Sequence, residues 1–351
     1  MIQMTECGDA AGWDAILDAF PVKDIYYMRG YVEGFRRHGD GEPVLISWTS
    51  GDLTALCVMM MRDVAADPRF AGRIPARQYF DMSTPYGYGG FIFSREPGGD
   101  ELDELRRELY AGLRSRGIIS AFFRFHPLLD NARHSAALMD VVELGKTVAI
   151  DTSDPDLIWT NISSKNRNVI RKAERSGVVI RNGSGKELFD EFVRIYNATM
   201  DHDHAAPYYY FDEPYYESLR DCVPDNHRIF YAELDGRIIS AAIMLYSGRL
   251  MHYHLSGSVL EYRPLAPSNL LLYRAAMWAC EHGITAFHLG GGVGSGEDSL
   301  YKFKAAFNRR SDCRFAIGRM IVDHTRFDAL VAMRDDDAFD SSSSYFPLYR
   351  S

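Results

Sequence analysis

Hydrophobic residues along the chain follow helical and then strand spacing, and this order occurs in both halves. In the first half, helical patterns over residues 7–20 and 24–35 precede two apolar runs joined by Ser50-Gly51, a dipeptide typical of hairpins. A charged helix over residues 100–116 then precedes a buried strand. We therefore predict an α+β unit for the first half. Its predicted strands are residues 43–50, 52–61 and 118–125.

The second half has the same order of elements, although its residues do not visibly repeat those of the first. Asp235-Gly236 joins two strand patterns and is a strong hairpin signal, so three consecutive antiparallel strands are expected here. Ser268 is expected to cap the helix that follows them. The predicted strands are residues 146–151, 227–234, 238–246, 250–256, 285–289 and 313–322, and the predicted helices are residues 156–162, 163–176, 186–200, 215–221, 268–282 and 325–334.

A glycine-rich corner follows the predicted strand at residues 285–289. Five glycines lie within residues 290–296, so the backbone there can approach a ligand or other backbone closely. Asp298 and its neighbours are suited to cap the next helix, which carries Lys302 and Lys304 in its first turns. A strand end, a glycine loop and two lysines together indicate a site for an anion or an oxyanion. The alternative is a flexible turn followed by an ordinary amphipathic helix.

The predicted helix over residues 163–176 is strongly basic, whereas the whole chain has a net charge of −9. Such runs are usually solvated helix faces. The concentration of positive charge in an acidic protein also favours a helix that faces phosphate. Its cations are Lys165, Arg167, Arg171, Lys172 and Arg175.

Two other segments carry candidate chemistry. Tyr86 and Tyr88 alternate with glycines in a loop, which indicates either aromatics buried in the core or a ligand-facing rim. Residues 201–204 alternate aspartate and histidine, but they lack the spacing of a defined metal site. We predict no metal.

Composition limits the class of protein. A chain of 351 residues with 46% hydrophobic residues can form two domains with separate cores. The negative net charge excludes a general attraction to nucleic acid, so any RNA contact needs a local patch. The five cysteines form no metal-binding or CxxC pattern, and the longest apolar run of nine residues is too short to span a bilayer. These features predict a cytoplasmic protein without stable membrane insertion.

The residues and the order of elements resemble the GNAT acyltransferase superfamily and, within it, the Fem family of non-ribosomal peptidyl transferases. The resemblance depends on the basic helix, on the glycine corner with the lysine helix that follows it, on the tyrosine–glycine loop and on the Tyr-Phe-Pro-Leu-Tyr-Arg sequence at residues 345–350. It implies two tandem GNAT-like domains, each a mostly antiparallel twisted sheet flanked by helices. The first would contain residues 1–146 and 325–351 and receive the acceptor, and the second, residues 147–324, would form the acyl-transfer core. The ending at residues 345–350 would then be docked rather than loose.

This sequence departs from the family pattern in two places. No long charged helical arm, which peptidoglycan Fem ligases often carry for tRNA, is present in the sequence. The segment Arg263-Pro-Leu-Ala-Pro-Ser-Asn269 stands where simple GNAT enzymes have a glycine-rich coenzyme A turn, and its prolines offer fewer amide donors. The second departure argues against acetyl-coenzyme A as donor.

The resemblance implies attack by an amine on an activated acyl carbon. By its match to the family, Lys304 would stabilise the developing oxyanion, an effect worth about 3 kcal/mol. No nucleophile motif for a covalent acyl-enzyme is visible. The candidates for the general base are Asp298, His254 and Tyr301, with Asp298 favoured, and the alternative to all three is substrate-assisted deprotonation. The candidate ligands of phosphate or substrate are Arg167, Arg171, Lys302, Ser268, Asn269, Tyr86 and Tyr88.

Three functions remain open at this point. The first is a Fem-type aminoacyltransferase that uses aminoacyl-tRNA and an amine-bearing peptidoglycan precursor or small metabolite. The second is an N-acyltransferase that uses acyl-coenzyme A or an acyl carrier protein on an amino sugar or polysaccharide precursor. The third is a catalytically silent binding module. In either enzyme the donor is a co-substrate, and no permanently bound cofactor is expected.

Overall fold

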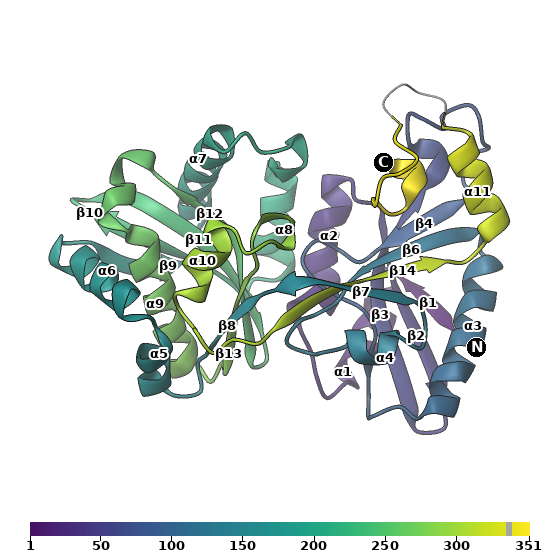
Figure 1. Ribbon diagram of the computed structural model, residues 1–351, viewed down its shortest axis with the longest axis horizontal. Coiled ribbons are helices and arrows are strands. Elements are labelled where there is room, and N and C mark those ends of the chain that lie inside the picture. Colours follow the sequence, from purple (N-terminus) through teal and green to yellow (C-terminus); the bar gives the residue numbers. More distant parts are fainter. Residues whose placement is uncertain (335–338) are drawn as a thin grey trace. The chain divides into compact units, whose positions relative to one another are not determined.

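The computed structural model describes residues 1–334 and 339–351, which fold into two compact units (Figure 1). The first unit contains Met1–Leu144 and Phe315–Ser351, and the second contains Gly145–Arg314. Each unit has its own sheet with helices packed against it, which confirms the expected α+β class. No described helix has both the length and the apolar character needed to span a bilayer.

The sheet of the first unit has the strand order β1-β2-β3-β4-β6-β14-β7, with β5 paired to β3 outside this path. Strands β1 to β4 pair successively in antiparallel fashion, whereas β4 and β6 run parallel. Helix α3 packs against β6 through buried leucines. The strands are β1 (Gln3–Glu6), β2 (Glu42–Ser50), β3 (Leu53–Asp63), β4 (Phe80–Ser83), β5 (Ile92–Phe93), β6 (Ile118–Arg124), β7 (Asp140–Lys146) and β14 (Arg314–Ile321). The helices are α1 (Ala10–Asp18), α2 (Arg29–His38), α3 (Gly99–Arg114), α4 (Ala132–Ser135) and α11 (His324–Ala332).

The sheet of the second unit has the order β8-β13-β12-β11-β10-β9. The predicted hairpin at Asp235-Gly236 is present, and β10, β11 and β12 are antiparallel as expected. Helices α5, α6 and α9 share one hydrophobic core with this sheet, whereas α7 packs against β11 and β12. The strands are β8 (Val148–Asp151), β9 (Val179–Gly183), β10 (His227–Leu234), β11 (Arg237–Ser247), β12 (Leu250–Ser258) and β13 (Ala286–Gly290). The helices are α5 (Pro155–Asn161), α6 (Ser164–Arg175), α7 (Lys186–His202), α8 (Glu213–Cys222), α9 (Pro267–Glu281) and α10 (Ser299–Ala305).

Strand β14 corrects the expected division of the chain. The expected boundary at residue 325 places this strand in the second domain, but it pairs with β6 in the sheet of the first unit, from Ile317 opposite Arg124 to Ile321 opposite Ser120. Its buried residues Ala316 and Met320 belong to the core of that unit. The chain therefore returns to the first unit about ten residues earlier than the resemblance implied.

The strands at the two ends of this sheet, β1 and β7, were not predicted. Both are edge strands, and their side chains are exposed or only half-buried. An edge strand needs few apolar residues, so it lacks the signal by which buried strands are found in sequence.

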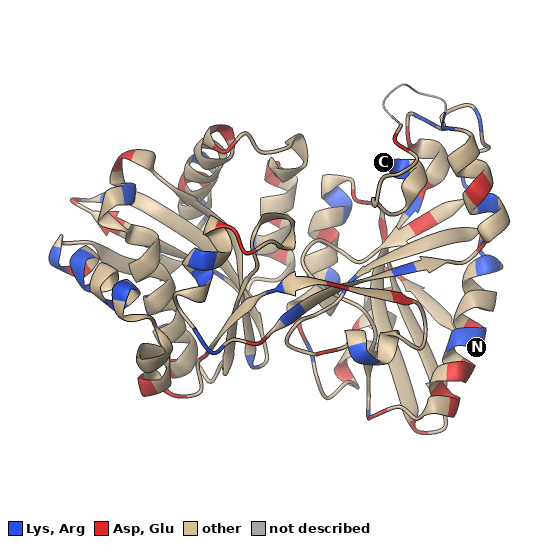
Figure 2. Cartoon of the chain, in the orientation of Figure 1, with Lys and Arg blue, Asp and Glu red and all other residues tan. Residues whose placement is uncertain are grey.

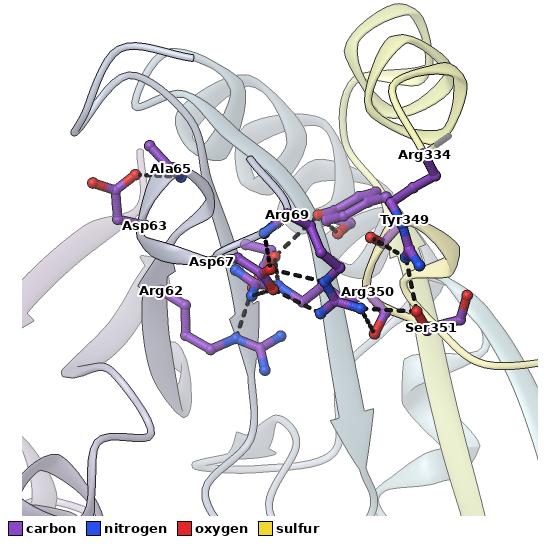
Figure 3. A network of polar contacts seen from close by, with 11 residues as sticks. Arg62, Asp63, Ala65, Asp67, Arg69, Arg334, Tyr349, Arg350 and Ser351 are labelled. Atoms are coloured by element: carbon purple, nitrogen blue, oxygen red, sulfur yellow. Dashed lines mark hydrogen bonds and ion pairs between the residues drawn. The ribbon is translucent and has the colours of Figure 1, made fainter. Parts of the chain in front are cut away.

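The last residues of the sequence dock into the first unit, as the resemblance implied (Figure 3). Tyr349 is fully buried, and its hydroxyl lies 2.8 Å from the Ser120 hydroxyl and donates to Asp81 at 3.2 Å. The Arg350 guanidinium binds the carboxylates of Asp81 and Asp67. Asp81 itself has no exposed surface, so its charge depends on these partners.

We predict that Asp81→Asn lowers the free energy of unfolding of the first unit by roughly 3–5 kcal/mol, because Arg62 and Arg350 then lose the buried carboxylate that both contact. Urea denaturation followed by tryptophan fluorescence measures this change. The matched control is Asp52→Asn, which removes a carboxylate from the exposed Arg95 and should leave the free energy of unfolding nearly unchanged, because solvent screens this ion pair. Equal effects of the two substitutions would contradict the role given to the docked segment.

Candidate active site

The glycine-rich corner of the second unit is built where β13 ends. Gly290 has a positive φ of 80°, which turns the chain out of the sheet. Gly292 packs so closely that an added Cβ would collide with the Gly296 carbonyl oxygen and the Asp298 carboxylate. The loop then leads directly into α10. These glycines therefore fold the loop back on itself, at the place where the sequence predicted a close approach.

Asp298 caps α10, which confirms its predicted capping role. Its Oδ1 accepts a hydrogen bond from the Tyr301 amide at 2.8 Å, and its Oδ2 accepts one from the Val293 amide at 3.0 Å. These two bonds lower the pKa of the carboxyl group. A carboxylate with both oxygens engaged and a lowered pKa is a weak proton acceptor. The geometry therefore argues against the preference for Asp298 as general base.

Lys304 is the buried cation of the corner. Its side chain is only 8% exposed, and its Nζ donates a hydrogen bond to the Gly291 carbonyl at 2.7 Å. Burial lowers the pKa of this amine to about 8, although the nearby Asp298 carboxylate acts in the opposite direction. Lys302 is exposed on the same helix, so the two lysines face different surroundings as predicted. Tyr301 is half-buried and packs against the hydrophobic core.

Strand β12 carries His254 at a bulge. Ile243 of β11 lies opposite Leu255 and Met244 lies opposite Tyr253, so His254 is the residue left over between them. Its Nε2 lies 2.5 Å from the hydroxyl of the buried Tyr215 on α8. Burial lowers the pKa of the imidazole to about 3, with a smaller contribution from His252. His254 is therefore neutral at physiological pH, and as a base it is weak.

The sheet opens next to this bulge. Strands β12 and β13 run parallel and are paired from Leu250 opposite Ala286 to His252 opposite His288. Beyond that pair, β12 continues to Ser258 while β13 turns into the glycine loop. The two strand ends thus diverge beside the glycine-rich corner, and backbone N–H and C=O groups that do not pair between these strands become available there for hydrogen bonds to a ligand.

The basic helix α6 holds its two candidate arginines beside Trp159. Arg167 donates to the carbonyls at the end of α5, including that of Ile162 at 3.1 Å, so its guanidinium caps that helix. Arg171 lies over the Trp159 ring at 5.1 Å and is exposed. The two residues share one helix face as predicted. The capping contacts leave Arg171 as the better placed of the two for phosphate.

Ser268 does not cap α9, and this prediction was wrong. The helix begins at Pro267, after Ala266 in the left-handed conformation, and has no side-chain cap. The Ser268 hydroxyl lies 3.0 Å from that of Ser240, and Asn269 donates to the Asn166 side chain at 2.8 Å. Both residues therefore join α9 to the sheet and to α6, and their role as phosphate ligands stays a prediction.

Tyr86 and Tyr88 belong to the first unit. Tyr86 stacks on Phe35 with ring centres 5.7 Å apart, and its carbonyl accepts a hydrogen bond from the Tyr31 hydroxyl. Tyr88 contacts Tyr26 edge-on. Both tyrosines are half-buried in an aromatic cluster, which fits the simpler of the two interpretations of this loop. Their exposure to a substrate stays a prediction.

The first unit also contains a buried carboxylate–imidazole pair that was not predicted from the sequence. Asp24 and His126 are both fully buried, with 3.4 Å between Asp24 Oδ2 and His126 Nε2. The Leu128 amide donates to His126 Nδ1, so in the neutral ring Nε2 carries the proton and points to Asp24. The two residues are about a hundred positions apart, and no local pattern marks either one.

Two sequence comparisons show which known proteins this chain is similar to. Residues 162–304 match the model of the acetyltransferase (GNAT) domain. The UDP-N-acetylmuramoylpentapeptide-lysine N(6)-alanyltransferase of Weissella viridescens is 31% identical over 149 residues, which is 41% of this chain and 42% of that protein. The chain thus matches less than half the length of this curated relative.

Solved structures show the fold over nearly the whole chain. FemX has a TM-score of 0.65 at 13% identity, with 93% of this chain and 99% of that chain covered. A conserved protein of unknown function from Bacteroides thetaiotaomicron has a TM-score of 0.58 at 13% identity, with 91% and 100% covered. The C-terminal domain of a putative lysylphosphatidylglycerol synthetase from Agrobacterium fabrum has a TM-score of 0.52 at 15% identity, with 89% and 91% covered. The expected resemblance to the Fem family within the GNAT superfamily is confirmed.

The lowered pKa of His254 predicts a pH dependence of stability. The unfolded chain binds a proton at His254 near pH 6.5, whereas the folded chain does so only near pH 3. The stability that this residue contributes is therefore present above pH 6.5 and is lost as the pH falls toward 3. We expect the difference in unfolding free energy between the wild type and His254→Gln to fall by on the order of 1–3 kcal/mol between pH 7 and pH 4.5.

Urea denaturation at the two pH values measures this difference. The control is His202→Gln, because His202 is exposed and its removal should leave the pH dependence unchanged. Parallel pH curves for the wild type and His254→Gln would contradict the burial argument.

Proposed function

We propose, from the premise that this chain is a Fem-like protein of the GNAT superfamily, that it is an aminoacyltransferase. It would move an amino acid from aminoacyl-tRNA to the amine of a peptidoglycan precursor or a small metabolite. The observation that carries this proposal is the buried Lys304 held against the glycine loop, inside the segment that matches the acetyltransferase domain. The name of the Weissella viridescens relative supplies the acceptor class, a lysine amine of a UDP-linked muropeptide.

The proposed chemistry places Lys304 at the oxyanion. The acceptor amine attacks the ester carbonyl of the donor, the carbonyl oxygen becomes negative in the tetrahedral intermediate, and the C–O bond to the tRNA ribose then breaks. An ammonium group has three donors, so Lys304 can keep its bond to the Gly291 carbonyl and still donate to the oxyanion. That existing bond fixes the position of Nζ before the substrate arrives, which is the condition for electrostatic stabilisation without reorganisation.

The proton of the attacking amine has no suitable protein acceptor among the candidates in this unit. The oxygens of Asp298 accept two backbone hydrogen bonds, and His254 is too weak a base. Tyr301 is half-buried against the core. We therefore propose that the amine enters uncharged and that its proton passes to the departing ribose oxygen within the substrates.

The alternative donor is an acyl-coenzyme A or acyl carrier protein thioester, and the match to an acetyltransferase domain model is the observation that favours it. The entry to α9 argues against it. Pro264 and Pro267 lack amide hydrogens, and the Pro264 carbonyl already accepts a bond from Lys172. Few backbone donors are left there for a pyrophosphate. An aminoacyl-tRNA donor also places the reaction in the cytoplasm, where such donors are made.

The proposal is tested by a transfer assay with purified protein. Labelled aminoacyl-tRNAs and labelled acetyl-coenzyme A are offered in parallel, each with UDP-linked muropeptides and other amines as acceptors. We expect label to pass from tRNA to a muropeptide amine. Transfer from coenzyme A alone would overturn the proposal and support the N-acyltransferase.

We predict that Lys304→Met lowers kcat by about 10²–10³-fold, because one preorganised oxyanion donor is lost while the buried volume is retained. The ratio of the wild-type rate to the Lys304→Met rate should also fall as the pH rises through about 8, where this lysine loses its charge, because deprotonation of the acceptor amine affects both enzymes equally. Initial rates at saturating donor measure both effects. The control is Lys186→Met, an exposed lysine on α7 whose loss should change kcat less than about twofold. A Lys304→Met enzyme with wild-type kcat would remove Lys304 from the mechanism.

A further inference from the structure

Positive charge is concentrated in two segments of the second unit. Of the 39 lysines and arginines in the chain, ten lie in residues 163–177 and 299–314, and only two acidic residues accompany them. The whole chain has a net charge of −9, so the remainder is far more acidic than the total indicates. Figure 2 shows the blue residues of the first segment along α6. This local excess is the kind of patch that an acidic protein needs in order to bind a polyanion.

Helix α6 presents these cations on one side because its other side is in the core. Asn166, Ile170 and Ala173, at helical spacing, are buried. Four of the six exposed positions of this helix are cationic. They are Lys165, Arg171, Lys172 and Arg175. At a rise of about 1.5 Å per residue, the row from Lys165 to Arg175 extends over about 15 Å.

The second basic segment is joined to the start of this helix by backbone hydrogen bonds. The Ser163 amide donates to the Ala306 carbonyl at 2.9 Å, and the Arg309 amide approaches the Asn161 carbonyl at 3.5 Å. Arg309 and Arg310 are exposed beside this junction. The row of cations on α6 therefore continues to the end of α10, the helix that carries Lys304.

These cations are not used to neutralise carboxylates. Elsewhere in the chain, arginines such as Arg36 and Arg95 form ion pairs with acidic neighbours. Among the described residues, no carboxylate lies within ion-pair distance of Lys165, Arg171, Lys172, Arg175, Arg309 or Arg310. Their charge is thus available to a partner. We call these six residues the cationic row.

We propose that the cationic row binds the phosphate backbone of the tRNA acceptor stem. This inference rests on the proposed function. The cationic row would make the tRNA contact for which peptidoglycan Fem ligases often carry a long helical arm. RNA is favoured over an anionic membrane because Ile170 and Ala173 of α6 are buried in the core and none of the exposed positions of this helix carries an apolar side chain that could insert. The row leads toward the Lys304 corner, so a bound stem would direct its acylated end there.

The binding test uses the full chain and unacylated tRNA. The double variant Lys165→Glu/Arg175→Glu changes two exposed cations at opposite ends of α6. We expect it to bind tRNA at least tenfold more weakly at 0.1 M salt, and the slope of log K against log salt to decrease by about 1.5, because two phosphate contacts are lost. Fluorescence anisotropy at four salt concentrations gives both quantities.

The matched control is Lys186→Glu/Arg194→Glu, which makes the same charge change on α7, where both residues are exposed. It should alter tRNA affinity less than threefold. An equal loss in the control would show that net charge alone decides binding and would overturn the proposal. Unchanged binding by the α6 variant would do the same. Binding of wild-type protein to phosphatidylglycerol vesicles but not to tRNA would assign the row to a membrane instead.

A second measurement separates this inference from the proposed function. Transfer is compared between full-length aminoacyl-tRNA and an aminoacylated 3′-terminal dinucleotide, which has no stem. The α6 variant should lose about tenfold in kcat/KM with the full-length donor and keep its rate with the dinucleotide. If the wild type transfers from neither donor yet binds tRNA through α6, the function is wrong and the binding surface stands. If both donors support transfer and the variant is unaffected, the function stands and the surface is wrong.

Discussion

A single hydrogen bond organises the candidate active site: the Lys304 ammonium to the Gly291 carbonyl, at 2.7 Å. A buried ammonium is costly unless a partner compensates for lost water, and the glycine loop supplies that partner. The loop can do so only because Gly292 lets it fold against Asp298, which in turn caps the helix that carries the lysine. Loop, cap and lysine therefore depend on one another, and the result is a cation fixed in place before any substrate binds.

The same arrangement changes the expected roles of the neighbouring groups. Asp298, the favoured base from sequence, has a structural function in the corner, and its hydrogen bonds lower its pKa. His254 is held neutral at a bulge by burial and contacts Tyr215. Asp298 thus holds the loop and the start of α10 together, whereas the burial of Lys304 itself increases the strength of its interaction with a developing negative charge.

Much of the fold could be predicted because its signals are local. Asp235-Gly236 marks a hairpin wherever it stands between two apolar runs, and Gly177, with φ at +82°, directly follows the basic helix, at the position where a left-handed glycine is favoured. The features that were not predicted depend on distant partners. The sheet that β14 joins is decided by its pairing with β6, and the bulge at His254 is decided by the register between two strands. Ser268 failed as a cap because the N-cap position is occupied by Ala266, two residues earlier, and the helix begins at Pro267. The contacts of Arg167 with the end of α5 likewise arise from the turn between two helices, which residue spacing does not reveal.

The central claim is that Lys304 recognises the charge of the tetrahedral intermediate and not the substrate in its ground state. Calorimetric titration of the wild type and of Lys304→Met with two ligands tests this directly. The first ligand is a 3′-terminal nucleotide that carries a phosphonate mimic of the tetrahedral intermediate. The second is the same nucleotide with a stable amide in place of the ester. We expect the variant to bind the phosphonate at least 100-fold more weakly than the wild type and the amide about equally well. Equal affinity of both proteins for the phosphonate would contradict the central claim.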